Sequence, residues 1–320
     1  MPTYQDRDRK PISEFTSSPA RKMDPHVFVI FGATGDLTKR LILPALYELT
    51  EKGSAHTFAV LGVARTDHDD AAFQQESAEA LHELAGIDEE KAQAWCEKFL
   101  IYEPIGDQSP EDYARVKARA KRVADERDLG PNRLFYLALP PSVFDDTVIA
   151  INDAGLCAEE DGWTRVVVEK PFGHSLETAR ELNELLHRYF REDQIFRIDH
   201  FLGKETVQNL LVFRFGNAIF EKVWNRENVE RVEILVPETL TVGSRAGYYD
   251  GSGAIRDMIQ NHLTQLLTLT AMEPPASPRA DDIQAEKVKV LRSILPLERK
   301  NVVLGQYGQG KAGGKDVQAY

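Results

Sequence analysis

The fold of this chain is decided by residues 27–37, Val-Phe-Val-Ile-Phe-Gly-Ala-Thr-Gly-Asp-Leu. The apolar run at its start is typical of a β-strand that is buried on both faces. Two glycines follow, and a helical pattern of apolar residues begins at Leu37, with Pro44 expected to interrupt that helix. Glycines at such a place allow a tight turn whose backbone N–H groups can bind a pyrophosphate. The spacing differs from the common GxGxxG, so a plain turn is the alternative, but the position between strand and helix favours a nucleotide-binding βαβ unit.

A second strand is expected at residues 57–64 and ends at Arg65. In dinucleotide-binding folds, the residue at this position reaches the adenosine ribose. An acid there binds a free 2′-hydroxyl, whereas an arginine suits a 2′-phosphate. Arg65, with Lys39 nearby, therefore favours NADP over NAD. The alternative is that Arg65 pairs on the surface with one of the aspartates that follow it.

Apolar strands alternate with helical segments through the first half of the chain. Further strands are expected at residues 99–102, 133–139 and 164–168, and this alternation predicts a parallel, doubly wound sheet of the Rossmann type. Ligands of such sheets bind at the carboxyl ends of the strands, where Lys170 lies. Because a proline follows it, Lys170 is held extended and could point at a cofactor or substrate, although a surface pair with Glu169 is also possible.

Composition limits the classes of function. The chain has 320 residues, enough for about two domains, and a net charge of −12 that argues against nucleic acid or an anionic membrane as the main partner. Two cysteines are too few for a disulfide framework, so a cytoplasmic location is expected. No apolar run approaches the length of a membrane span, the first ten residues do not resemble a secretory signal, and no metal site is predicted.

The second half carries a cluster of chemically active residues directly after an expected strand end. Residues 197–204 read Arg-Ile-Asp-His-Phe-Leu-Gly-Lys. An imidazole next to a carboxylate at a strand terminus suits a charge relay or a phosphate-binding site. The alternative is a solvated loop with a surface ion pair, and these eight residues alone favour that alternative.

Two later segments complete the pattern. Residues 229–236 alternate between apolar and polar, which predicts a strand in a sheet with one covered face, and Glu238 lies just past it. A helix is expected to follow, and one face of it carries Ile255, Ile259, His262, Leu263, Leu266 and Leu267. A histidine on an apolar face is usually a satisfied core residue. Beside a carboxylate, a buried imidazole would instead be a tuned general base.

Taken together and in this order, the motifs resemble those of the glucose-6-phosphate dehydrogenase family. The matching stretches are residues 32–37, 135–141 (Phe-Tyr-Leu-Ala-Leu-Pro-Pro), 169–173 (Glu-Lys-Pro-Phe-Gly), 197–204 and 256–262 (Arg-Asp-Met-Ile-Gln-Asn-His). The likeness runs from about Val27 to about Tyr307. It implies oxidation of D-glucose 6-phosphate at C1 to 6-phospho-D-glucono-1,5-lactone with reduction of NADP⁺, the first step of the pentose phosphate pathway.

The resemblance also implies a role for each matching residue. His262 would be the general base that removes the C1 hydroxyl proton, and Asp199 would orient it, which requires the two side chains to lie together. Glucose 6-phosphate would be bound by Lys170, His200, Lys204, Glu238 and Asp257. The coenzyme would be bound by Gly32, Ala33, Thr34, Gly35, Asp36, Leu37, Lys39, Arg65, Tyr136 and Lys170.

The chain also departs from the family pattern. Phe201 stands where the family usually has tyrosine, and the chain stops at Tyr320, whereas family members continue with a long segment. That segment supplies much of the antiparallel sheet and the dimer surface, so the family's homodimer or tetramer is doubtful for this chain. We expect a loose tail at residues 1–24, an NADP-binding domain at 25–198 and an incomplete α+β domain with a mostly antiparallel sheet at 199–320. A non-catalytic NADP-binding remnant is the alternative function.

Overall fold

The computed structural model describes residues 23–53, 57–159, 162–237, 246–306, 308–312, 315–317 and 319. These residues belong to two compact units, and the chain passes from one to the other between Ile198 and Asp199. Most of the expected tail and Glu238 lie outside the described residues. No described helix combines the length and the apolar character needed to cross a membrane.

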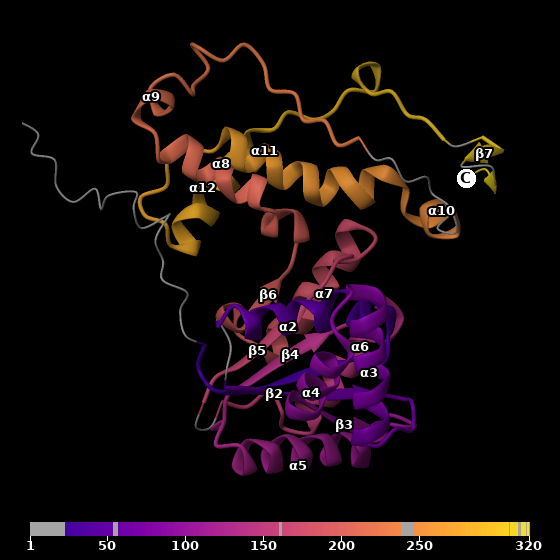
Figure 1. Ribbon diagram of the computed structural model, residues 1–320. Coiled ribbons are helices and arrows are strands. Elements are labelled where there is room, and N and C mark those ends of the chain that lie inside the picture. Colours follow the sequence, from indigo (N-terminus) through magenta and orange to yellow (C-terminus); the bar gives the residue numbers. More distant parts are fainter. Residues whose placement is uncertain are drawn as a thin grey trace, which may run out of the picture. The chain divides into compact units, whose positions relative to one another are not determined.

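The N-terminal unit is built on a six-stranded sheet in which every pair of neighbours is parallel (Figure 1). In spatial order the strands are β3 (Leu100–Pro104), β2 (Phe58–Ala64), β1 (His26–Phe31), β4 (Arg133–Leu137), β5 (Thr164–Val168) and β6 (Ile195–Arg197). The order reverses between β1 and β4, which is the topological switch point of a doubly wound sheet. The predicted fold class is therefore confirmed for this unit.

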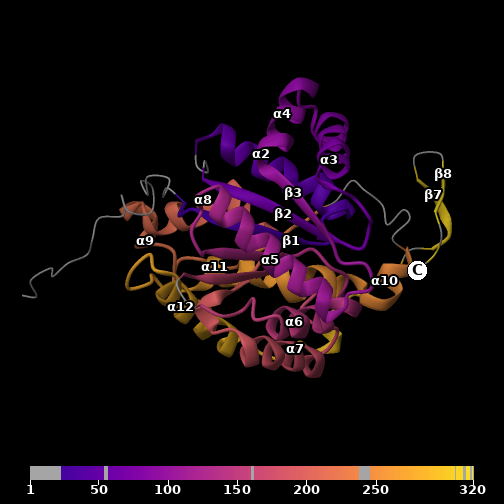
Figure 2. The ribbon, with the colours of Figure 1, turned by 90° about the horizontal axis from the view of Figure 1, so that it is seen from below.

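Helices cover both faces of this sheet, as Figure 2 shows. One face carries α2 (Leu43–Glu51), α3 (Asp70–Ala85) and α4 (Glu89–Phe99), and the other carries α5 (Pro110–Glu126), α6 (Phe144–Asp153) and α7 (Leu176–Tyr189). Side chains of β1 alternate between the two cores, with Val27, Val29 and Phe31 on the α5 side and Phe28 and Ile30 on the α2 side. Helices cover both faces of this strand, which accounts for the apolar side chains at all positions after His26.

The turn after β1 requires glycine at its first position. Gly32 has a φ of 85°, and a Cβ placed there would lie 2.2 Å from the carbonyl oxygen of Ala138. The following helix begins at Asp36, continues through the π-helical segment η1 (Thr38–Ile42) and becomes regular in α2, where Pro44 lies in the first turn. The hydrogen bond from the Leu43 N–H to the Thr38 carbonyl spans five residues, so the irregular π-helical segment lies directly before the proline, which has no N–H to donate. The helix expected to be interrupted at Pro44 is therefore continuous, and its irregularity is the π-helical segment before the proline.

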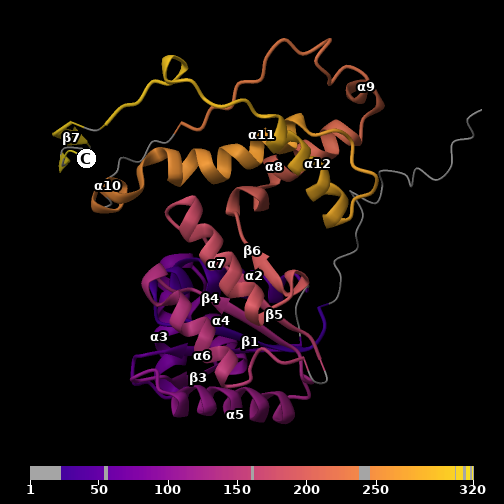
Figure 3. The same ribbon diagram turned by 180° about the vertical axis from the view of Figure 1, so that it is seen from behind.

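The C-terminal unit is mainly helical in the described residues (Figure 3). After the short turn η4 (His200–Gly203), its helices are α8 (Glu205–Phe215), α9 (Ala218–Glu221), α10 (Ala246–Ala254), the π-helical η6 (Ile255–Leu263), α11 (Thr264–Ala271) and α12 (Ala280–Ser293). Helices α8 and α11 share an apolar core of Val207, Phe215, Leu269 and Met272, and α12 packs on it. Strands β7 (Gly310–Ala312) and β8 (Lys315–Val317) form an antiparallel hairpin.

The strand expected at residues 229–236 is not formed. This stretch has no regular secondary structure, and Val232 and Leu235 are 47% and 81% exposed. An alternating pattern becomes a strand only when a neighbouring strand satisfies its backbone N–H and C=O groups. No described residue supplies such a neighbour.

Candidate active site

Asp199 and His262 are 63 residues apart in sequence and lie together in the C-terminal unit. His262 Nδ1 is 2.5 Å from Asp199 Oδ1, and the two side chains are 1% and 11% exposed. An ionised carboxylate can only accept, so the proton of the neutral imidazole is assigned to Nδ1. Nε2 is then the nitrogen that can accept a proton from a substrate.

The π-helical form of η6 explains which of its side chains face this site. In a π-helix the hydrogen bonds run between residues five apart, so Asp257 and His262 lie over one another. Both are buried, whereas Ile255 and Ile259 are 47% and 43% exposed. The prediction that Ile255 and Ile259 lie on the same buried face as His262 was therefore wrong, because that prediction assumed an α-helix with 3.6 residues per turn. Asp257, an expected sugar ligand, accepts a hydrogen bond from the Tyr249 hydroxyl at 2.9 Å.

The turn η4 holds the imidazole in a fixed orientation. The backbone N–H of Phe201 donates to Asp199 Oδ1 at 3.0 Å, so one carboxylate oxygen anchors both the turn and His262. The Phe201 ring is stacked on the His262 ring, with centroids 4.2 Å apart and planes 12° apart. The ring of His200 packs edge-on at 4.6 Å from that of His262.

Two exposed groups next to this dyad can carry positive charge. His200 is exposed, and the ammonium of Lys204, also exposed, lies 3.8 Å from the centroid of the Phe201 ring. Ligating atoms of Asp199, His200 and His262 lie within 4.8 Å of one another. Because the Asp199 carboxylate already accepts a hydrogen bond from the His262 imidazole, we interpret this cluster as a hydrogen-bonded dyad beside two groups that can carry positive charge. Such an arrangement suits an anionic substrate that loses a hydroxyl proton.

The expected coenzyme residues lie at the carboxyl ends of β1 and β2. Residues 32–37 form the turn and the helix start, and the Thr34 hydroxyl is 3.2 Å from that of Thr66, the residue after Arg65. Arg65 itself is exposed. The alternative of a surface ion pair is not found among the described residues, because Asp69 instead caps α3 and Asp70 accepts from the N–H of Tyr102.

Two other expected ligands, Lys39 and Tyr136, are engaged by carboxylates distant in sequence. The ammonium of Lys39 lies 2.8 Å from Glu76 on α3. Tyr136 donates its hydroxyl hydrogen bond to Glu169 at 2.5 Å, and burial together with this carboxylate raises the pKa of Tyr136. Lys170 follows β5 and precedes a cis bond to Pro171. Partners so distant in sequence leave no local pattern that could have revealed them.

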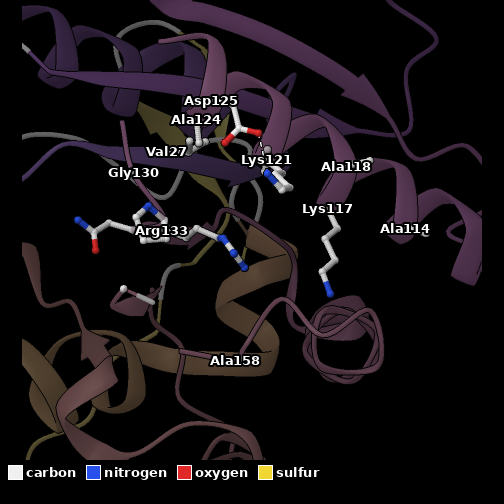
Figure 4. A pocket seen from close by; sticks show the side chains of 14 residues that line it. Val27, Ala114, Lys117, Ala118, Lys121, Ala124, Asp125, Gly130, Arg133 and Ala158 are labelled. Atoms are coloured by element: carbon white, nitrogen blue, oxygen red, sulfur yellow. Dashed lines mark hydrogen bonds and ion pairs between the residues drawn. The ribbon is translucent and has the colours of Figure 1, made fainter. Parts of the chain in front are cut away.

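A cavity of about 550 Å³ lies elsewhere, at the amino ends of β1 and β4 (Figure 4). Helix α5 forms one wall with alanines and with Lys117 and Lys121, and Arg133 lies at the start of β4. Lys121 is already paired with Asp125 at 2.6 Å. Ligands of doubly wound sheets bind at the opposite, carboxyl edge, so this cavity is not the coenzyme site.

Comparison with known proteins gives consistent results along the chain. Residues 29–209 match the family model "Glucose-6-phosphate dehydrogenase, NAD binding domain", and residues 211–320 match "Glucose-6-phosphate dehydrogenase, C-terminal domain". Among curated relatives, the glucose-6-phosphate 1-dehydrogenase of Aggregatibacter actinomycetemcomitans is 44% identical over 91% of this chain and 60% of that protein. The enzyme of the same name from Bacillus subtilis is 40% identical over 92% of this chain and 60% of that protein.

Solved structures agree. A glucose-6-phosphate dehydrogenase in complex with its substrate glucose 6-phosphate has a TM-score of 0.84 and 38% identity, over 92% of this chain and 61% of that one. The enzyme from Mycobacterium avium has a TM-score of 0.74 and 35% identity, over 86% of this chain and 59% of that one. This chain thus spans about 60% of the length of these relatives. With both family models matched in order and the dyad in place, the chain belongs to the glucose-6-phosphate dehydrogenase family.

Proposed function

We propose that this chain carries the coenzyme-binding unit and the catalytic dyad of an NADP-dependent glucose-6-phosphate dehydrogenase. The reaction is oxidation of D-glucose 6-phosphate at C1 to 6-phospho-D-glucono-1,5-lactone. The observation that supports it most is the contact of His262 with Asp199 beside two potential cations. These are the groups needed to deprotonate one hydroxyl of a phosphorylated sugar.

His262 acts as the general base. Its Nε2 accepts the proton of the C1 hydroxyl while the C1–H bond breaks and the lactone C=O bond forms. Asp199 stabilises the imidazolium that results, and Phe201 keeps the ring in its plane. General-base assistance of this kind contributes about 10²–10⁴-fold in rate. His200 and Lys204 bind the sugar phosphate, which gives an anionic substrate a local positive site in a chain of net charge −12.

The N-terminal unit fits a dinucleotide. The glycine turn leads directly into the N-terminal end of a helix, where the helix dipole favours a bound anion, and Arg65 at the end of β2 is exposed for a 2′-phosphate. When bound, NADP⁺ supplies the hydride acceptor. Lys170, at the carboxyl end of β5, contacts substrate and coenzyme in this proposal.

The test is turnover of glucose 6-phosphate with NADP⁺, followed by the absorbance of NADPH. His262→Asn should abolish turnover, because asparagine cannot take up the proton, and should leave NADP⁺ affinity near that of the unaltered chain. His187→Asn is the matched control, since His187 is an exposed histidine on α7 that pairs with Glu192. Equal activity of the two variants would contradict the role of His262.

A non-catalytic coenzyme-binding fragment is the second candidate, and the 60% coverage of the relatives favours it. Calorimetry distinguishes the two. Tight NADP⁺ binding without glucose 6-phosphate binding supports the fragment, and measurable turnover eliminates it.

A further inference from the structure

Arg214 is an almost fully buried cation near the end of α8. Its side chain is 4% exposed and donates hydrogen bonds to the carbonyl oxygens of Leu269 at 2.6 Å and Met272 at 2.8 Å. These carbonyls belong to the last turn of α11 and to the residue that follows it, where carbonyl groups have no partner within the helix. Burial lowers the pKa of Arg214 to about 10, so its side chain still carries a charge at neutral pH. The negative end of the helix dipole favours a cation at this place, and Arg214 thus caps α11.

Trp224 strengthens the same connection. Its indole N–H donates to the carbonyl oxygen of Thr270 at 2.8 Å, and the centroid of its ring lies 5.2 Å from the Arg214 guanidinium. The ring of Phe215 lies 4.6 Å from that guanidinium. The guanidinium Nε has no acceptor among the described residues, which leaves the two carbonyls as the hydrogen-bonding partners of this buried cation. Three carbonyls at the end of α11 are therefore bound by side chains from α8 and the residues shortly after it.

The catalytic dyad joins the same two helices at their other ends. Asp199 lies directly before η4 and α8, and His262 lies in η6, which continues into α11 without a break. The two carbonyls that Arg214 binds follow His262 by seven and ten residues. At about 1.5 Å per residue, the dyad and the Arg214 contacts are about 10–15 Å apart along the helix. Helices α8 and α11 thus lie side by side with the same chain direction and are joined at both ends, with an apolar core between them (Figures 1 and 3).

We propose that Arg214 is a positioning residue that fixes the register of α11 against α8 and thereby holds His262 within hydrogen-bonding distance of Asp199. A slide of α11 by one residue would move its backbone by about 1.5 Å. That displacement is enough to break the 2.5 Å contact between His262 Nδ1 and Asp199 Oδ1. Apolar contacts between the helices are non-directional and tolerate such a slide, whereas a planar guanidinium bound to two carbonyls does not. The inference rests on the proposed function, in which His262 is the base and Asp199 orients it.

The experiment observes the proton on His262 Nδ1 by NMR of the ¹⁵N-labelled chain, where an imidazole N–H that donates to a carboxylate resonates far downfield. The signal is assigned by its loss in His262→Asn. In Arg214→Met, which removes both hydrogen bonds to α11, the signal should move upfield or disappear because the contact with Asp199 lengthens. Arg214→Lys, which replaces the planar fork by a single ammonium, should shift it in the same direction and serves if Arg214→Met does not fold. An unmoved signal in the folded variant overturns the proposal.

The matched control is Ile283→Ala on α12. Ile283 packs on the same apolar core but belongs to neither of the two helices that the dyad joins. Urea unfolding should show that Ile283→Ala also destabilises this unit, while the His262 Nδ1 signal stays at its original position. A shift in Ile283→Ala as large as that in Arg214→Met would show that any loosening of the core disturbs the dyad, and would overturn the specific role of Arg214.

Kinetics give a second readout where the chain is active. In Arg214→Met, kcat should fall by about 10²-fold, the effect expected when a catalytic group is displaced by about 1 Å. The NADP⁺ affinity measured by calorimetry should stay unchanged, since the expected coenzyme residues lie in the N-terminal unit. Equal losses of kcat and NADP⁺ affinity would indicate general unfolding and contradict a positioning role. The NMR measurement needs no turnover, so this inference can fail while the proposed function stands, and the proposed function can fail while the dyad still depends on Arg214.

Discussion

Phe201 lies nearly parallel to the imidazole of His262 and is 7% exposed, so it is both a core residue and the surface that orients the ring. We predict that Phe201→Ala costs about 3–5 kcal/mol in the free energy of unfolding and lowers kcat, because a cavity replaces the stacked ring. Phe201→Tyr, which keeps the ring, should cost less than about 1.5 kcal/mol. Urea unfolding and steady-state kinetics measure both effects.

The matched control for that substitution is Phe196→Ala, since Phe196 is 45% exposed on β6. A smaller loss of stability is expected there, because much of its ring is already in water. If Phe201→Ala left both stability and kcat as they are in the control, the proposed orienting role would be wrong.

Arg65 tests the choice of coenzyme at the residue scale. It is exposed at the end of β2 and forms no ion pair with a described residue. Arg65→Ala should weaken NADP⁺ binding by about 1.5–3 kcal/mol, the value of a charge-assisted hydrogen bond, and leave NAD⁺ binding unchanged. Titration calorimetry with both coenzymes measures this, and Arg122→Ala on the exposed side of α5 is the control. Equal losses for NAD⁺ and NADP⁺ would contradict a 2′-phosphate contact.

At the scale of elements, the turn between β1 and the next helix is tightly constrained by its backbone. Gly32→Ala should destabilise the N-terminal unit by about 3 kcal/mol, at the upper end of backbone strain, because φ is positive and a backbone carbonyl lies in the path of the methyl group. Gly106→Ala is the control, since a Cβ there meets nothing within 4 Å. Similar denaturation midpoints for the two variants would show that the turn relaxes more easily than the geometry indicates.

The elements also show where sequence patterns suffice. The strands that form β1 and β2 were predicted nearly to the residue, because a strand that is buried on both faces has a continuous run of apolar residues. The bounds of β5 were also predicted, although Arg165 interrupts its apolar run. Residues 229–236 carried an equally clear pattern, yet a strand depends on a partner that the pattern does not contain. The exposure of Ile255 and Ile259 was not predicted, because no local sequence pattern indicates that this segment is π-helical.

At the scale of the whole molecule, the chain divides into two units with separate cores. We predict that residues 23–198 fold without the rest of the chain, since the sheet and the helices on both its faces lie within them. Cys96 and Cys157 report on this, because both are buried in this unit and burial raises the pKa of each thiol to about 12. In the isolated fragment both thiols should react slowly with a disulfide reagent in buffer and rapidly in urea. Rapid reaction in buffer would show that the unit needs the remainder of the chain.

Much of the candidate site could be named from motifs, but its arrangement could not. The resemblance pointed to His262 and Asp199, and the residue types around them indicated proton transfer on a phosphorylated substrate. Glu76 gave no such signal, and Glu169 was named only as a possible partner of Lys170, not of Tyr136. Their importance comes from the side chains that they contact, Lys39 and Tyr136, which are distant in sequence.

Short-range patterns thus settled the parallel sheet, its glycine turn and the identity of the dyad, because strand burial, turn geometry and motif chemistry are properties of consecutive residues. Only the tertiary structure shows that the His262 ring stacks on Phe201 and that Asp199 Oδ1 accepts hydrogen bonds from both the turn and the imidazole. It also shows that Asp199 Oδ2 is buried and accepts no hydrogen bond from a described residue. These contacts join segments separated by some sixty residues. Their existence depends on how helices of the C-terminal unit fit against one another, which no local stretch encodes.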